Sequence, residues 1–85
     1  MIKIKIYTIP DCIYCEEVKR FLKDKKIKFR EIKVMQNKEY AKEMIIKSRQ
    51  KNVPVLEMDS NIIIRKDKEG SKEVIEKIKK ILDKR

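Results

Sequence analysis

The chain has no histidine and only two cysteines among its 85 residues. A structural zinc site needs four protein ligands, so a single copy of this chain has too few nitrogen and sulfur ligands to build one. Long apolar runs are also missing. Residues 62–64 form one of the longest, far too short to cross a bilayer, and residues 1–7 alternate where a secretory signal would be continuously apolar. We therefore expect a soluble protein that stays in the cytoplasm.

Aromatic residues are scarce, at 6% of the chain, whereas charged residues reach 45%, with 24 Lys and Arg against 14 Asp and Glu. The net charge of +10 fits a nucleic-acid binder, a partner of acidic proteins, or simply a surface covered in lysine. The lysines are spread from Lys3 to Lys84, and the few aromatics do not alternate with a basic cluster as a base-stacking surface requires. We therefore prefer the lysine-covered surface and rank nucleic-acid binding last.

The length of the chain limits it to one hydrophobic core, because a chain this short buries only about 60% of its unfolded surface on folding. Residues 1–85 are therefore expected to form a single domain. Hydrophobic residues make up 41% of the chain, enough to build that core.

The first third of the chain has the pattern of a strand, a helix and a second strand. Apolar and polar residues alternate over residues 2–7, and Pro10 with Asp11 ends this first predicted strand. From Cys12 onward, apolar residues recur every three or four positions, which predicts a helix as far as the charged residues 25–26. A second strand is predicted within residues 27–34. Two strands joined by a helix in this way are parallel neighbours.

The rest of the chain predicts a helix, a hairpin and a final helix. Asn37 is a suitable N-cap for a helix that ends near Ser48. Residues 53–58 and 62–65 predict an antiparallel hairpin around three turn-forming residues. The apolar face of the middle helix is expected to contain Tyr40, Ala41, Met44 and Ile45, and that of the final helix, which begins at Gly70 and Ser71, to contain Val74, Ile75, Ile78, Ile81 and Leu82.

The predicted order of elements is β-α-β-α-β-β-α, without a repeat or a linker. A parallel strand pair followed by an antiparallel hairpin, with three amphipathic helices, predicts an α/β protein in which helices flank a four-stranded mixed sheet. This is the layout of the thioredoxin fold.

Cys12 and Cys15 lie where the first predicted strand passes into the first predicted helix. A sulfur at a helix N-terminus faces unpaired N–H groups and the positive end of the helix dipole, and both stabilise a thiolate. Since thiolates attack disulfides, Cys12 is predicted to be the attacking thiol. Cys15 lies one turn further along the same face and towards the core, where burial keeps it protonated until it resolves the mixed disulfide.

Two other interpretations of this cysteine pair remain. A structural disulfide closing so short a loop would contribute only about 2 kcal/mol, and cytosolic thiols are normally kept reduced. A metal site would require ligands from two chains or an outside thiol. Redox chemistry explains the position of the pair between strand and helix better than either.

Residues 7–15 resemble the active-site segment of the glutaredoxins and of the glutaredoxin-like redoxins that serve ribonucleotide reductase. Tyr14 resembles the glutaredoxin form, whereas Asp11 and Ile13 resemble the reductase-partner form. Val53-Pro54 is similar to the family's Val-Pro pair, which has its proline in cis before the third strand. The resemblance extends over residues 2–82.

This resemblance implies the thioredoxin fold and a set of substrate-binding residues. It places Pro54 beside Cys12 and has the Val53 backbone pair with an incoming peptide or glutathione like an added strand. Tyr14 and Asp67 are the other residues that it assigns to substrate binding. Some glutaredoxins also hold an iron-sulfur cluster between two chains, which makes a metal or cluster module using Cys12 across a dimer the alternative function.

The sequence departs from the family where the hairpin ends. Family members usually have Gly-Gly or Gly-Phe and then an acidic residue, whereas this chain has residues 64–67 as Ile, Arg, Lys and Asp. A lysine that many members carry three residues before the first cysteine is Ile9 here. Because glycine allows a ligand to approach closely, these changes predict poor coupling to glutathione. The cations Lys47, Arg49, Arg65 and Lys66 could attract a carboxylate-bearing ligand or an acidic partner, although exposed charges are more often only solvated.

Together these features predict a thiol-disulfide oxidoreductase that carries electrons in cell redox homeostasis. Its substrates would be protein disulfides, and a separate reductase or a low-molecular-weight thiol would regenerate it. We expect a monomer with no cofactor apart from its redox-active disulfide, and no membrane partner.

Overall fold

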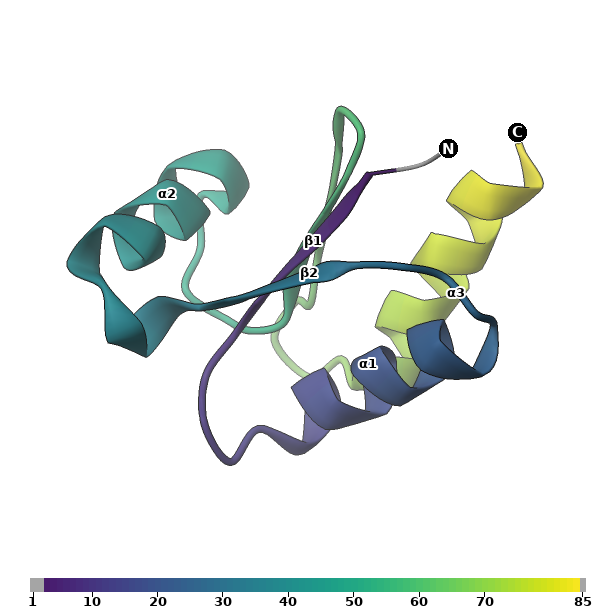
Figure 1. The fold of residues 1–85 in the computed structure, drawn as a ribbon, viewed down its shortest axis with the longest axis horizontal. Coiled ribbons are helices and arrows are strands. Elements are labelled where there is room, and N and C mark those ends of the chain that lie inside the picture. The colour runs from purple at the N-terminus through teal and green to yellow at the C-terminus, as the bar shows by residue number, and fades with distance from the viewer. Residues whose placement is uncertain (1–2, 85) are drawn as a thin grey trace.

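The alternating apolar residues near the start of the chain form a central strand of a mixed sheet. β1 (Ile4–Thr8) runs parallel to β2 (Arg30–Lys33) on one side and antiparallel to β3 (Val55–Met58) on the other. β4 (Asn61–Ile64) pairs antiparallel with β3, which gives the strand order β2-β1-β3-β4. Figure 1 shows the fold in the computed structural model, which describes residues 3–84. The predicted four-stranded mixed sheet is confirmed.

Helices cover both faces of this sheet. α1 (Ile13–Asp24) and α3 (Ser71–Asp83) pack against one face and against each other, whereas α2 (Lys38–Ser48) lies against the other face (Figure 1). The short 3-10 helix η1 (Val34–Gln36) joins β2 to α2. This arrangement confirms the predicted thioredoxin fold. None of the helices within residues 3–84 has both the length and the apolar character needed to cross a membrane.

The two side-chain directions of β1 divide the core into two parts. Ile4 and Ile6 pack on the side of α1 and α3, whereas Tyr7 packs on the side of α2, because successive strand residues point to opposite faces. The part on the α1 side contains Ile4, Ile6, Val18, Leu22, Leu56, Met58, Ile63, Val74 and Ile78. The part on the α2 side contains Tyr7, Cys12, Cys15, Ile32, Val34, Met44, Val53 and Val55. Both cysteines therefore lie in the second part of the core.

The strand boundaries differ from the predicted ones. Ile2, where the first strand was predicted to begin, lies outside the described residues, and β1 continues to Thr8. The second strand is shorter than predicted, because the Ile27 amide donates to the Leu22 carbonyl (2.9 Å) and holds the chain to the end of α1. The hairpin turn has two residues where three were predicted, since Asn61 pairs with Met58 in the sheet.

The buried stripe of α2 also needs a correction. Ile45 was predicted to face the core, but 38% of it is exposed, and Met44 is the buried residue of this helix. The face that meets the sheet continues from Met44 to Lys47, three positions further along, which turns Ile45 away. The helix starts as predicted, with the Asn37 side chain accepting from the Glu39 amide (2.9 Å).

The last helix begins where the sequence predicts. Gly70 is the N-cap of α3, and its amide donates to the Glu73 carboxylate (3.0 Å). Val74 and Ile78 are fully buried against the sheet, and Ile75, Ile81 and Leu82 pack partly buried around them. This apolar face packs α3 against the sheet, where α3 contacts both α1 and β4.

Candidate active site

Cys12 is the N-cap residue of α1. Its backbone is extended (φ −103°, ψ 106°), and its Sγ accepts a hydrogen bond from the Cys15 amide at 3.1 Å. The sulfur thus occupies the place that a Ser or Asp oxygen takes in most N-caps, facing N–H donors and the positive end of the helix dipole. Cys12 is 9% exposed, so a small part of it remains open to solvent. The start of the helix therefore presents an N–H donor to this sulfur.

Cys15 lies in the first turn of α1 and is 1% exposed. Burial raises the pKa of its thiol to about 12, and the hydrogen bond to Cys12 and the charge of Cys12 act in the same direction. The Ile9 backbone and the positive charge of Lys19 oppose this shift only in part. Both cysteines are free thiols in the structure. The two sulfurs therefore differ in environment as the sequence predicts, with Cys15 held in its protonated form.

The segment before β3 lies in the same part of the core as the two thiols. The Val53–Pro54 peptide bond is cis, which confirms the isomer implied by the resemblance. Val53 and Pro54 are buried, and Val53 belongs to the cluster that contains Cys12 and Cys15. Tyr14 is 37% exposed on α1. The structure thus brings these predicted site residues to one end of the sheet.

Arg65 contacts two of these residues at once. Its guanidinium lies over the Tyr14 ring, 4.4 Å from the ring centroid, and its Nε donates to the Val53 carbonyl at 2.7 Å. Its Nη1 donates to the Glu69 carbonyl at 3.0 Å. The alternative that Arg65 is only a solvated charge is therefore wrong. Ile64 pairs with Val55 in the sheet, and this register places the next residue beside the Val53 segment.

Asp67 is exposed and accepts a hydrogen bond from the Asn52 side chain at 2.8 Å. The same Asn52 nitrogen also approaches the Arg65 carbonyl at 3.4 Å. Asp67 therefore links the loop after β4 to the residue that precedes Val53. Asn52 was not among the predicted site residues, and only its neighbour Val53 pointed to it in the sequence.

The four cations that were predicted to attract anions do not act as one group. Lys47 donates to Glu57 (2.9 Å) and to the Tyr7 hydroxyl (3.3 Å) and forms an ion pair with Glu43 (3.5 Å). The hydrogen bond to Glu57 is the main cause of the raised pKa of Lys47. Its charge is already neutralised, which rules it out of the anion-attracting group. Arg49 and Lys66 are exposed.

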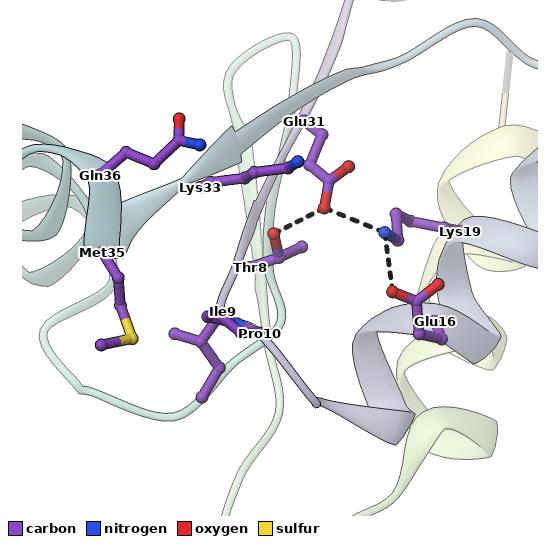
Figure 2. Close-up of a pocket in the computed structure, with 9 residues that line it drawn as sticks. All are labelled: Thr8, Ile9, Pro10, Glu16, Lys19, Glu31, Lys33, Met35 and Gln36. Carbon is purple, nitrogen blue, oxygen red and sulfur yellow. Dashed lines mark hydrogen bonds and ion pairs between the residues drawn. The ribbon is translucent and has the colours of Figure 1, made fainter.

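A partly buried ion pair lies beside the site. Thr8 donates to the Glu31 carboxylate at 2.7 Å, and Lys19 bridges Glu31 and Glu16 at 3.0 Å each (Figure 2). Burial works against ionisation of Glu31, but the hydrogen bonds from Thr8 and Lys19 outweigh it and lower the pKa of this carboxyl. These residues line a cavity of about 330 Å³, together with Ile9, Pro10, Lys33, Met35 and Gln36.

Sequence reasoning missed this group. Lys19 follows Cys15 by four positions, which places the two on one helix face and is the only signal that the sequence offers. Glu31 reaches the site because it pairs in register with Ile6, which depends on the folded sheet. Among residues 3–84 there is no group of three His, Cys, Asp or Glu side chains that could hold a metal ion.

Comparison with known proteins supplies a family. The glutaredoxin family model matches residues 4–63, which include both cysteines and the Val53–Pro54 pair. A glutaredoxin-like 8.6 kDa protein from the rubredoxin operon of Clostridium pasteurianum is 39% identical over 74 residues, covering 87% of this chain and 99% of the relative.

Solved structures of glutaredoxins and a glutaredoxin-like protein have the same fold as this chain. The glutaredoxin from Brucella melitensis is similar with a TM-score of 0.71 and 27% identity, over 99% of this chain and 87% of that one. The glutaredoxin-like protein NrdH-redoxin from Escherichia coli has a TM-score of 0.68 and 22% identity, over 87% of this chain and 92% of that one, a likeness in fold. Residues 64–67 lie beyond the part matched by the family model.

Proposed function

The chain belongs to the glutaredoxin family, and from this premise we propose that it is a dithiol oxidoreductase that reduces protein disulfides with Cys12 and Cys15. The family and the fold support thiol-disulfide redox chemistry in general. The observation that carries the finer proposal is the unequal setting of the two sulfurs. The sulfur of Cys12 is an N-cap with an N–H donor at 3.1 Å, whereas Cys15 is buried and has a pKa raised to about 12.

The reaction has two exchange steps. In the first, the Cys12 thiolate attacks one sulfur of the substrate disulfide, the substrate S–S bond breaks, and the leaving thiolate takes a proton from solvent. In the second, Cys15 loses its proton to solvent and its sulfur attacks the Cys12 sulfur. The Cys12–Cys15 disulfide forms, the bond between Cys12 and the substrate breaks, and the released substrate thiolate takes up a proton. Two electrons have then passed to the substrate. A thiol-bearing donor, either a reductase or a low-molecular-weight thiol, returns two electrons to the protein.

Substrate binding is proposed at the face formed by Tyr14, Val53, Pro54 and Asp67. An extended substrate segment would pair with the Val53 backbone like an added strand, which brings its disulfide to Cys12. Ile13 is 66% exposed next to the thiol, and Ile9 is partly exposed, so the rim offers apolar contact to a protein surface. This rim favours protein disulfides as substrates, and we propose a cytoplasmic monomer that meets them there.

Two single-cysteine variants test this function. Cys12→Ser should abolish reduction of a protein disulfide, because it removes the attacking sulfur. Cys15→Ser should stop after the first step and accumulate a mixed disulfide between Cys12 and the substrate, detected by intact-mass spectrometry. Metal analysis of protein prepared without oxygen accompanies both variants.

Two results would contradict the proposal. One is a Cys12→Ser protein that still reduces the substrate at the wild-type rate. The other is stoichiometric metal or iron-sulfur cluster in the wild type that is lost in Cys12→Ser, which would favour the cluster module shared by two chains.

A further inference from the structure

The Arg65 side chain donates a hydrogen bond to a backbone carbonyl that lies beside the reactive thiol. Its Nε donates to the Val53 carbonyl at 2.7 Å, and Val53 packs in the same cluster as Cys12 and Cys15. A substrate segment that adds to this edge as a strand needs backbone groups of Val53 for its own hydrogen bonds. Arg65 and such a segment therefore compete for one carbonyl. The replacement of the family's glycines at residues 64–66 did not by itself indicate this contact, because the contact depends on how β4 is aligned with β3.

The guanidinium also covers part of the face that a substrate must approach. It lies 4.4 Å from the centroid of the Tyr14 ring, and a second nitrogen holds the Glu69 carbonyl at 3.0 Å. The side chain is thus fixed at three points and spans from the end of β4 to the first turn of α1. Docking at this face requires the side chain to move or to take a new partner.

The charge of Arg65 has no carboxylate partner in the part of the chain that the structure describes. Its partners there are two carbonyl oxygens and one ring. The nearby acidic side chains bond elsewhere: Glu69 pairs with Lys77 at 2.8 Å, and Asp67 accepts from Asn52 at 2.8 Å. A guanidinium binds a carboxylate through two parallel hydrogen bonds, more strongly than it binds a carbonyl or a ring face. A carboxylate supplied by a substrate could therefore displace these contacts.

We propose that Arg65 determines specificity, closing the Cys12 face to neutral disulfides and opening it to disulfides with a carboxylate next to the reacting cysteine. This inference rests on the proposed function and names its substrate class. An acidic residue draws the guanidinium away and frees the Val53 carbonyl for the substrate. A neutral substrate must break the same contacts without replacement, and the loss of a hydrogen bond to a charged group corresponds to about a tenfold lower rate.

The test compares two peptide disulfides that differ only in Asp or Asn after the cysteine. Single-turnover reduction of each is measured with wild-type protein, Arg65→Met, Arg65→Lys and the control Lys72→Met. The control removes one exposed charge at the start of α3 and leaves the site intact. Wild type and the control should prefer the Asp peptide about tenfold. Arg65→Met should lose this preference, mainly by reducing the Asn peptide faster.

Arg65→Lys separates charge from geometry. A lysine keeps the positive charge but lacks the planar group that bonds Val53 and stacks on Tyr14, so the Asn peptide should react faster while part of the Asp preference remains. This variant also maintains the test if Arg65→Met fails to fold. Equal rates for both peptides with wild type, or an unchanged ratio and unchanged rates in both Arg65 variants, would overturn the proposal.

A binding measurement distinguishes failure of this inference from failure of the proposed function. The Arg65 Nε–H resonance should be protected from solvent exchange in the free protein. It should shift on adding an Asp peptide whose cysteine is replaced by serine, and shift less with the Asn peptide. An unprotected resonance that neither peptide moves would refute the role of Arg65, even if Cys12-dependent reduction is normal. The expected shifts without any disulfide reduction would support the role of Arg65 and refute the reductase function.

Discussion

Raising the pH from 7 to 10 should destabilise the reduced protein through Cys15. The folded-state pKa of this thiol is raised to about 12 by burial, whereas an unfolded cysteine ionises near 8.5. A raised folded pKa gives stability that is fully present below the unfolded value and is lost as the pH rises towards the folded value. Above pH 8.5 the unfolded chain loses this proton and the folded chain keeps it, so unfolding becomes more favourable.

The expected loss can be worked out from these two values. At pH 10 the thiolate of Cys15 outnumbers the thiol about thirtyfold in the unfolded chain, whereas the folded chain keeps the thiol almost entirely protonated. This difference lowers the free energy of unfolding by about 2 kcal/mol. For a protein of marginal stability this is a large fraction of the total. The Cys15→Ala variant has no thiol at this position, so it lacks this pH-dependent contribution to stability. The stability difference between the wild type and this variant should therefore shrink by about 2 kcal/mol between pH 7 and pH 10.

Urea unfolding of both proteins in excess reductant at the two pH values measures this change. Lysines and tyrosines also titrate in this range, but they are present in both proteins and cancel in the comparison. Tyr7, for example, has a pKa raised by burial in the structure that both proteins share. A stability difference that is the same at pH 7 and pH 10 would refute the reasoning, because Cys15 would then titrate alike in folded and unfolded chains.

Two further predictions concern the ion pair beside the site and the electron donor. Glu31→Gln should lower the free energy of unfolding at pH 7 by about 1 to 2 kcal/mol, whereas the exposed Glu39→Gln should have almost no effect. Because the folded-state pKa of Glu31 is lowered, its stabilisation is present above the pKa of the unfolded carboxyl and is lost as the pH falls below it. The stability difference between wild type and Glu31→Gln, measured by thermal melts, should therefore narrow as the pH falls from 7 into the acid range, and a difference that does not narrow would contradict this. Oxidised protein should be reduced faster by a thioredoxin-reductase system than by glutathione, since Ile64 to Lys66 replace the glycines of the family, and efficient turnover with glutathione would contradict that departure.

Local patterns in the sequence determined the order of elements and the location of the thiols. Each of these patterns depends on residues that lie close together in the sequence: the alternation that forms β1, the helical spacing after Cys12, and the caps at Asn37 and Gly70. The N-cap position of Cys12 and the burial of Cys15 also follow from such short distances along the chain. The Val53–Pro54 pair was located through family resemblance, and its cis bond agrees.

Tertiary structure alone decided which distant groups meet at the site. Arg65 reaches Val53 and Tyr14 because β4 pairs in register with β3, and Glu31 reaches Lys19 because β2 pairs with β1. A one-residue change of register would turn each of these side chains to the opposite face of the sheet. The sequence lists the charges but not their partners, because the partner of a long cationic side chain depends on how strands separated in sequence are aligned.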